Sequence, residues 1–268
     1  MNNKIGFIGC GNMASAMIKG IIKSGLIKAE NIIASDPDIE KLNDMKNETD
    51  IKITSNNLEI AKFSNILVLS VKPNKYKDVI EEIRESISEN TIIVTIAAGI
   101  AQDKTEEYLG RDMKVVRTMP NTPALVGEGM SALSHNRNVN EAELNIIVDI
   151  FKCFGKVEVV EESYIDTITA LTGSSPAYVY MFIEALADGA VLKGLPRAKA
   201  YTMAAQAVYG SAKMVLETGR HPGQLKDDVC SPGGTTIEAV YSLEKNGLRA
   251  AVIEAMDKCI EKAKTMNK

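Results

Sequence analysis

The sequence has little histidine, no close pair of cysteines and no long apolar run. Its 268 residues include two histidines, His135 and His221, and four cysteines that stand far apart without a Cys-x-x-Cys pair. Neither histidine lies beside an obvious catalytic partner, so we interpret both as surface or turn residues rather than members of a Ser-His-Asp relay. The cysteine spacing favours reduced thiols over disulfides or a zinc site, and we expect no metal.

An excess of positive charge is also absent. The 31 lysines and arginines stand against 35 aspartates and glutamates, which gives a formal net charge of −4. We therefore expect no nucleic-acid partner and no membrane partner. No apolar segment reaches membrane-spanning length, and the first residues lead straight into a strand-like segment. We expect neither a signal peptide nor an anchor, and a cytoplasmic location.

The first part of the chain alternates short β-branched runs with helical stretches. This alternation predicts an α/β fold with a parallel, Rossmann-type doubly wound sheet covered by helices on both faces. Helices are expected between most of the strands, over residues 12–23, 39–46, 77–87, 103–108 and 141–154. The expected strands are residues 4–9, 31–35, 51–53, 65–71, 91–96, 113–117, 130–134 and 156–160.

After Tyr164 the β-branched runs disappear and helical patterns dominate. Residues 176–193 are apolar nearly all round, and a helix without a polar face is buried in a bundle or against another subunit. Pro196 opens a second helix, expected to reach about Thr218, and a Gly/Pro-rich stretch then leads into helices over residues 235–246 and 248–264. We place a domain boundary near residue 164, which gives domains of residues 1–164 and 165–268.

A glycine-rich turn follows the first predicted strand. The segment Gly6-Phe-Ile-Gly9-Cys-Gly11-Asn-Met-Ala14 contains the pattern Gly-x-Gly-x-x-Ala between a strand and a helix. Gly9 permits the tight turn, Gly11 lets the backbone approach a pyrophosphate, and Ala14 lets helix and strand pack closely. The pyrophosphate would lie at the N-terminus of the following helix. At the start of a βαβ unit, this motif predicts dinucleotide binding.

Residues at the ends of later strands extend the predicted cofactor site. Asp36 stands about 20 residues past the glycines, where an acidic residue takes the ribose hydroxyls of NAD; the other interpretation is an N-cap of the next helix. The loop around it holds no arginine for a 2′-phosphate, which leans towards NAD. Lys72 could add a positive charge near the cofactor or be a solvated lysine. The small residues Ala97 and Ala98 would admit the nicotinamide half.

The stretch Ser231-Pro-Gly-Gly-Thr-Thr-Ile-Glu238 is the other informative segment. Thr235 and Glu238 have the spacing of a capping box, so one interpretation is a well-capped helix start. The alternative is an anion cradle, in which the backbone amides of Gly233 to Thr236 hold a substrate carboxylate and the Thr236 hydroxyl reaches the reacting nitrogen. Ser174, just before Pro176, could cap a helix or line the same site.

At these residues the chain resembles the pyrroline-5-carboxylate reductase family from end to end. The segment Ser231-Pro-Gly-Gly-Thr-Thr236 matches the family's best-known signature. Family members usually read Ser-Gly-Ser-Gly-Pro where this chain has Thr172-Gly-Ser-Ser-Pro176, so Ser175 replaces a glycine. Further matching segments are Gly6–Ala14, Val71-Lys-Pro73, Ala97-Ala-Gly99, Arg117-Thr-Met-Pro-Asn-Thr-Pro123, Ala185-Leu-Ala-Asp188, Gly194-Leu-Pro-Arg197 and His221-Pro-Gly-Gln-Leu-Lys226.

The resemblance implies a Rossmann domain, an all-helical C-terminal dimerisation and substrate domain, and reduction of 1-pyrroline-5-carboxylate to L-proline with NADPH or NADH, the last step of proline biosynthesis. It implies a homodimer or a higher homo-oligomer. It implies substrate contacts from Gly233, Gly234, Thr235 and Thr236, with Thr236 as the catalytic residue. The cofactor contacts that it implies are Gly9, Cys10, Gly11, Asn12, Met13, Ser35, Asn57, Val71, Lys72, Pro73, Ala97 and Ala98.

Two other functions fit the same architecture. A β-hydroxyacid dehydrogenase has the same two-domain plan. Members of that family share a catalytic lysine on the first long helix of the second domain. No lysine occurs between Lys156 and Lys193, which argues against that chemistry. A nicotinamide-nucleotide-sensing regulatory protein could keep the fold without turnover, but it would have no need of the Ser231–Thr236 segment as a second ligand site.

Overall fold

Eight short strands make a single sheet in the computed structural model, which describes residues 3–266. Their order is β3-β2-β1-β4-β5-β6-β7-β8. The central strands β1, β2, β4 and β5 are buried at every residue, as their β-branched runs require. The strands are β1 (Ile5–Ile8), β2 (Ile32–Ser35), β3 (Lys52–Thr54), β4 (Ile66–Leu69), β5 (Ile92–Thr95), β6 (Lys114–Met119), β7 (Gly129–His135) and β8 (Gly155–Val159).

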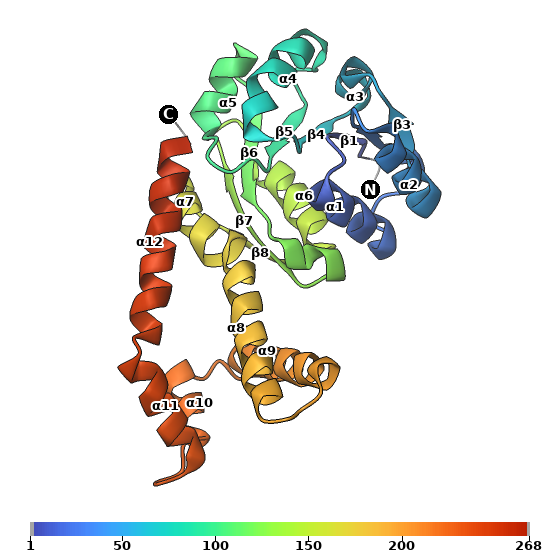
Figure 1. Ribbon diagram of the computed structural model, residues 1–268. Helices are drawn as coiled ribbons and strands as arrows, with labels where there is room; N and C mark the ends of the chain where they lie inside the picture. The colour runs from blue at the N-terminus through green and yellow to red at the C-terminus, as the bar shows by residue number, and fades with distance from the viewer. Residues whose placement is uncertain (1–2, 267–268) are drawn as a thin grey trace. The chain divides into compact units, whose positions relative to one another are not determined.

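Helices cover both faces of this sheet (Figure 1). On one face, α1 (Asn12–Ser24), α2 (Ile39–Thr49) and α6 (Glu141–Lys152) bury side chains in one apolar cluster with alternate residues of the strands. On the other face, α3 (Asn57–Phe63), α4 (Tyr76–Ile83) and α5 (Gln102–Leu109) bury theirs in a second cluster. Because side chains alternate along a strand, Phe7 faces the first cluster and Ile8 the second. The predicted doubly wound sheet is confirmed.

Two features of this half differ from the sequence prediction. Strand β7 runs antiparallel to β6, whereas a wholly parallel sheet was expected. The connection from Met119 to Gly129 is too short for a helical crossover, so the chain turns back instead. Helix α3 was not predicted; it begins after Asn56, whose side chain accepts a hydrogen bond from the Leu58 N–H, and ends at Phe63.

The chain forms two compact units. The first comprises residues up to Ser174 together with Cys259 onwards, and the second comprises Ser175–Lys258. The functional division predicted at residue 164 stays a prediction. The remaining helices are α7 (Ile165–Ile168), a π-helical turn at Thr169–Gly173, α8 (Ser175–Leu192), α9 (Arg197–Thr218), α10 (Pro222–Asp228), α11 (Thr235–Lys245) and α12 (Leu248–Met266). The predicted helices of the C-terminal part are thus present, and α10 lies within the Gly/Pro-rich stretch.

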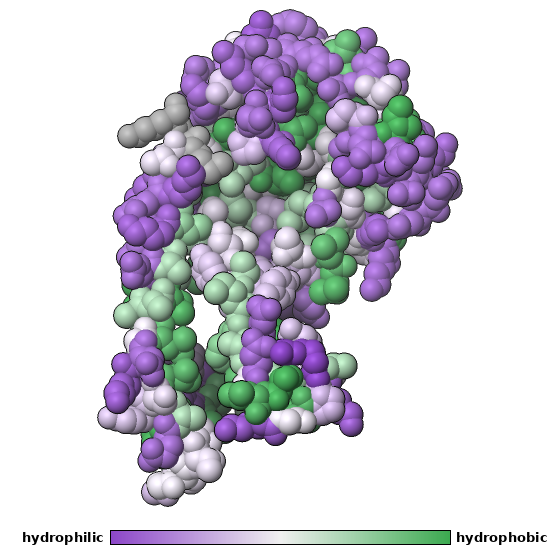
Figure 2. Space-filling view, in the orientation of Figure 1, coloured by the Kyte–Doolittle hydropathy of each residue, from purple (hydrophilic) through white to green (hydrophobic). Residues whose placement is uncertain are grey.

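The surface of the second unit carries many large apolar side chains. On α8, Tyr180, Met181 and Phe182 are 58%, 69% and 43% exposed. Figure 2 shows apolar side chains on the visible surface of this helical part. Such a concentration of apolar surface is typical of an interface. The sequence predicted that α8 is buried in a bundle or against another subunit; within one chain many of its large apolar side chains are exposed, which favours the second alternative.

We expect Met181→Glu to shift the assembly towards monomers, because a carboxylate in an apolar interface must be desolvated without a partner. Light scattering at assay concentration measures the change. Val126→Glu, which alters a 76% exposed apolar residue of the first unit in the same way, should leave the assembly unchanged. A folded, active wild-type monomer would contradict the prediction of an obligate homo-oligomer.

Candidate functional site

Most residues of the predicted cofactor site lie at the carboxyl ends of neighbouring parallel strands. The strand order reverses between β1 and β4, so the loops after these two strands diverge to opposite faces of the sheet. The Gly9 N–H donates to the Ser35 carbonyl oxygen at 2.8 Å, and the Ser70 N–H donates to the Ile8 carbonyl oxygen at 2.9 Å. The Ser70 hydroxyl lies 2.7 Å from the Gly9 carbonyl oxygen. These bonds hold three strand ends together at the edge where α/β sheets bind nucleotides.

The glycine-rich turn has the form that a pyrophosphate requires. Gly9 adopts a φ of +97°, and a Cβ there would lie 2.6 Å from the Ser70 carbonyl oxygen. At Gly11, by contrast, the space is open: a Cβ built there meets no atom within 4 Å. Gly11 is also the N-cap of α1, where no side chain caps the helix and no acidic residue occupies the first turn. An anion could therefore take these N–H groups and the positive end of the helix dipole.

Three further predicted residues belong to this turn. Asn12 is exposed as the first residue of α1, whereas Met13 packs against the apolar cluster behind it. The Cys10 side chain is 2% exposed, and burial raises the pKa of its thiol. Cys10 is therefore a neutral core residue whose backbone, rather than its sulfur, faces the turn.

Asp36 joins the glycine-rich turn to the end of β2. Its Oδ2 accepts a hydrogen bond from the Cys10 N–H at 2.8 Å, and its Oδ1 accepts one from the Asp38 N–H at 2.9 Å. The interpretation of Asp36 as an N-cap is wrong: Asp38 caps α2 by accepting a bond from the Lys41 N–H. Asp36 therefore lies at the end of β2 with its orientation fixed by two backbone N–H groups, and its contact with a ribose stays a prediction.

A cation does lie beside this loop, although the sequence offered no arginine. The Lys41 Nζ is 3.0 Å from Asp38 Oδ2, and its hydrogen bond with Asp38 raises the pKa of Lys41. The analysis of the sequence missed Lys41 because it lies within a helix rather than in the loop. An ammonium group here could offset a 2′-phosphate, so the loop does not exclude NADP.

The other predicted cofactor residues line the same edge of the sheet. The buried Ser35 hydroxyl donates to Asn57 Oδ1 at 2.7 Å, and Asn57 Nδ2 donates to Glu82 Oε2 at 2.9 Å. Asn57 therefore has a fixed orientation at the start of α3. After β4, Val71 and Pro73 are half-buried and Lys72 is exposed between them.

The loop after β5 carries Ala97 and Ala98. Ala97 is 4% exposed, and its N–H donates to Thr95 Oγ1 at 3.3 Å. Ala98 is half-buried and packs against a small apolar cluster that contains Met119 and Ile165. Their contact with the nicotinamide stays a prediction.

The second unit contains the predicted substrate cradle. Pro232 and Gly233 form a turn that is closed by the Gly234 N–H donating to the Ser231 carbonyl oxygen at 3.0 Å. Gly233 adopts a φ of +65°, and a Cβ on Gly234 would lie 2.3 Å from Ser231 Oγ. Pro and a left-handed Gly in these places are typical of a type II turn. The segment thus has one fixed backbone path into α11.

The capping-box interpretation of Thr235 and Glu238 is wrong. Gly234 is the N-cap of α11, no side chain caps the helix, and Thr235 and Thr236 are its first two residues. A capping box would have required Thr235 to be the N-cap, whereas it is the first residue inside the helix. In the described part of the chain, neither threonine hydroxyl has a hydrogen-bond partner, and Thr236 is half-buried while Thr235 is exposed. The free helix start is what the anion-cradle interpretation requires.

Ser174 lies in the first unit, apart in the chain from Gly233–Thr236. Its N–H donates to the Thr169 carbonyl oxygen at 2.8 Å, and its Oγ lies 3.2 Å from Cys259 Sγ. Its hydroxyl is therefore already occupied, and its role in substrate binding stays a prediction.

The two histidines have the structural roles that the sequence indicated. His221 is the N-cap of α10 and its Nδ1 accepts a bond from the Gly223 N–H at 3.0 Å, while His135 is exposed. Among residues 3–266, no three His, Cys, Asp or Glu side chains gather as metal ligands would. Within the same range, no helix is long and apolar enough to cross a membrane.

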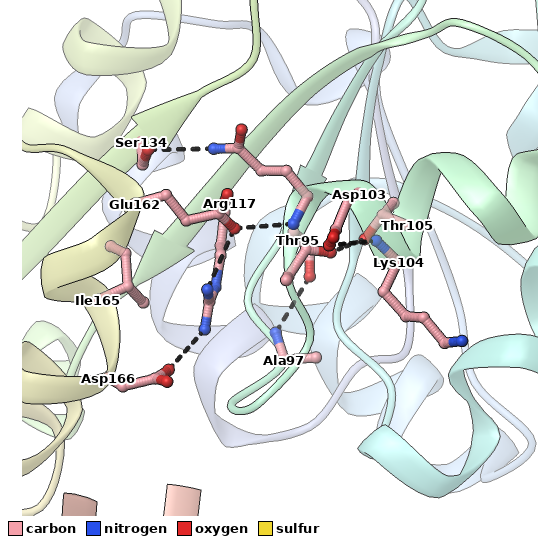
Figure 3. Close-up of polar contacts among 12 residues, drawn as sticks. Thr95, Ala97, Asp103, Lys104, Thr105, Arg117, Ser134, Glu162, Ile165 and Asp166 are labelled. Carbon is pink, nitrogen blue, oxygen red and sulfur yellow. Dashed lines mark hydrogen bonds and ion pairs between the residues drawn. The ribbon is translucent and has the colours of Figure 1, made fainter. Parts of the chain in front are cut away.

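One buried charged residue escaped the analysis of the sequence. Arg117 on β6 is 3% exposed and pairs with Glu162 at 3.1 Å and Asp166 at 2.9 Å (Figure 3). Arg117 stood within a matching segment, but its chemistry was not considered. An arginine in an otherwise apolar strand run was the signal that could have identified it.

Comparison with known proteins places these features in context. Residues 162–266 match the family model described as pyrroline-5-carboxylate reductase dimerisation, and residues 4–99 match the one described as NADP oxidoreductase, coenzyme F420-dependent. The chain is 50% identical to a pyrroline-5-carboxylate reductase of Escherichia coli (strain K12) over 268 residues, which is the full length of both.

Solved structures agree with the sequence relatives. A pyrroline carboxylate reductase of Plasmodium falciparum with NADP bound is 38% identical, with a TM-score of 0.91 over 100% of this chain and 99% of that one. A pyrroline-5-carboxylate reductase of Coxiella burnetii is 35% identical, with a TM-score of 0.93 over 100% of both chains.

We expect Asp36→Asn to raise the ratio of kcat/KM for NADPH to that for NADH by about fivefold or more, because unit charges 4 Å apart interact by about 1 kcal/mol even in water. The amide oxygen keeps one of the two hydrogen bonds that the carboxylate accepts from the Cys10 and Asp38 N–H groups, and a melting curve on the same preparation checks that the turn persists. Steady-state kinetics with both cofactors measure the ratio.

Glu40→Gln is the matched control, since it removes an exposed negative charge from the first turn of α2 and leaves the pair between Asp38 and Lys41 in place. Its ratio should change less. An unchanged ratio for Asp36→Asn, or equal changes for both variants, would show that Asp36 has no direct contact with the ribose.

Proposed function

The chain belongs to the pyrroline-5-carboxylate reductase family, and we propose that it reduces 1-pyrroline-5-carboxylate to L-proline by hydride transfer from NADPH or NADH. The main observation that supports this activity is the 50% sequence identity, over the full length, to a pyrroline-5-carboxylate reductase. The second is the signature turn at Ser231–Thr236, whose uncapped helix start suits a carboxylate. The chain is thus an oxidoreductase of proline biosynthesis that acts on a C=N bond, and it forms a homo-oligomer through the part that matches the dimerisation model.

The residues of the first unit fit a nicotinamide dinucleotide. The open space at Gly11 and the uncapped start of α1 suit the pyrophosphate, and Asp36 suits the ribose. We assign the cofactor site to Gly9–Met13, Ser35, Asp36, Asn57, Val71–Pro73, Ala97 and Ala98. When bound, the cofactor supplies the hydride that reduces the C=N bond.

The cradle residues of the second unit hold and orient the substrate in our proposal. The N–H groups of Gly233, Thr235 and Thr236 bind its carboxylate at the positive end of α11, while the Gly234 N–H, which is bonded to the Ser231 carbonyl oxygen, holds the turn that presents them. With the neutral imine, the Thr236 hydroxyl donates a hydrogen bond to the ring nitrogen and passes its proton there as the imine carbon accepts the hydride, and water returns a proton to the hydroxyl. With the protonated imine, the hydroxyl oxygen accepts a hydrogen bond from the ring N–H and orients the ring. A cyclic imine binds partly as its protonated cation, so no strong acid is needed. Positioning can supply up to roughly 7–11 kcal/mol of the acceleration.

A nucleotide-sensing regulatory protein remains the alternative function on this fold. The uncapped start of α11 after a fixed turn argues against it, because a sensor of nucleotides alone has no use for a second anion site. Turnover of pyrroline-5-carboxylate with each reduced nicotinamide distinguishes the two. Cofactor binding without turnover would support the sensor.

We also propose which function each part of the chain has. Residues 1–164 bind the dinucleotide, and residues 165–268 provide dimerisation and the substrate cradle; the start of the dimerisation match at residue 162 supports this division. A cytoplasmic location is consistent with free cysteines at Cys10, Cys153, Cys230 and Cys259.

We expect Thr236→Val to lower kcat by roughly 10- to 100-fold with little change in the cofactor KM, because a hydrogen bond to a charged group is worth about 1.5–3 kcal/mol. The substitution keeps the branched shape, and since Gly234 caps α11, the helix start should survive. Steady-state kinetics and a melting curve on the same preparation measure both effects.

Thr235→Val is the matched control one residue earlier. It should raise the substrate KM or leave it unchanged, with a much smaller effect on kcat. A near-normal kcat for Thr236→Val would contradict the catalytic role of its hydroxyl.

A further inference from the structure

Residues 96–101, here called the nicotinamide loop, connect β5 to α5 and carry Ala97 and Ala98. The loop begins after Thr95, which is directly paired with Arg117 on the adjacent strand β6. The Ala97 N–H donates to Thr95 Oγ1, so one end of the loop is bonded to the strand that precedes it. Thr95 is fully buried, which leaves that end little freedom.

The other end of the loop is bonded to Glu162, far along the chain. The backbone N–H of Gln102, the first residue of α5, donates to Glu162 Oε1 at 2.8 Å. The same oxygen accepts a bond from Arg117 Nη1 at 3.1 Å. The Gln102 side chain donates to the buried Ser134 hydroxyl at 3.0 Å. Arg117 thus fixes the carboxylate that in turn fixes the end of the loop (Figure 3).

The second arm of the guanidinium reaches α7. Arg117 Nη2 donates to Asp166 Oδ1 at 2.9 Å, and the neighbouring residue Ile165 packs in the cluster that Ala98 contacts. One planar fork therefore sets both the carboxylate that bonds the loop and the helix against which the loop packs. A lysine, with a single ammonium group, cannot hold both carboxylates in this geometry.

Stability alone does not explain this ion network. A buried ion network seldom stabilises a fold more than well-packed apolar residues in the same place would. Arg117 Nε is also buried without a hydrogen-bond partner among residues 3–266, which costs stability further.

We propose that Arg117 is a positioning residue that, through Glu162 and Asp166, holds the nicotinamide loop in the conformation that hydride transfer requires. The inference rests on the proposed function, since it takes Ala97 and Ala98 as contacts of the nicotinamide. Arg117 itself touches neither cofactor nor substrate; it acts through the loop.

The test compares NADPH with 2′-phospho-ADP-ribose, which lacks the nicotinamide. For Arg117→Lys we expect a weaker Kd for NADPH, an unchanged Kd for the truncated ligand, and a kcat lower by on the order of 10- to 100-fold, since a misplacement of about 1 Å costs about 100-fold in rate. A kinetic isotope effect with 4-deuterated cofactor should increase as hydride transfer becomes slower. Glu162→Gln should give a milder form of the same pattern, because its amide oxygen can still accept the Gln102 N–H.

Lys114→Met is the matched control. It removes another half-buried ion pair of β6, with Glu143 at 2.5 Å, and does not touch the loop. It should leave both ligand affinities and kcat near the wild-type values. If Arg117→Lys does not fold, Glu162→Gln decides by the same measurements.

Equal changes in affinity for the two ligands, or a normal kcat with a lower melting temperature, would overturn the positioning role. Ala98→Leu separates this failure from an error in the cofactor site, because a bulky side chain on the loop should weaken NADPH selectively. A selective effect of Ala98→Leu without one of Arg117→Lys rejects the role of Arg117 alone. No selective effect in either variant rejects the placement of the nicotinamide, and absence of turnover in the wild type rejects the proposed function.

Discussion

The close approach of the β1 and β4 strand ends is the constraint on which the cofactor site depends. The carbonyl of Ser70 occupies the space that a side chain on Gly9 would need, and the Ser70 hydroxyl bonds the backbone of the same turn. These atoms hold the turn from behind, and the first N–H groups of α1, which follow Gly11, have no side-chain cap. Asp36 then fixes the turn from the β2 side through the Cys10 N–H. The free space at Gly11 follows from these three contacts rather than from the glycine alone.

Much of the first unit could be predicted from sequence because its strands are short, β-branched runs separated by helical patterns. The direction of β7 could not, since strand pattern carries no direction and only the length of the connection after Met119 decides it. Helix α3 was missed because its seven residues are too few to display a helical period. The capping position before α11 differed by one residue because either Gly234 or Thr235 could serve as N-cap, and the turn geometry selects Gly234.

The residues of the candidate site also fall into those that the sequence could predict and those that it could not. Residues at strand ends and glycine turns were predictable, because their chemistry is local and their spacing is regular. Arg117 was not, because its partners Glu162 and Asp166 lie 45 and 49 residues away in the chain and only the folded sheet brings them together. Lys41 was overlooked for a related reason, since its ion pair with Asp38 depends on the first turn of α2. Local motifs are thus readable from the sequence, whereas buried long-range pairs become visible only in the folded chain.

The chain leaves the first unit at Ser174 and returns to it at Cys259, and the Ser174 Oγ and Cys259 Sγ lie 3.2 Å apart. In topological terms the helical unit is an insertion into the first unit rather than an appendage at its end. Because the two ends of the insertion are adjacent, the fold of the first unit already holds them together. The entropic cost of closing the inserted segment is therefore part of folding the first unit. Insertions with neighbouring ends can change in length or sequence without displacing their host. The helical unit can therefore change its apolar surface and its turn at Ser231–Thr236 while the sheet of the first unit stays constant.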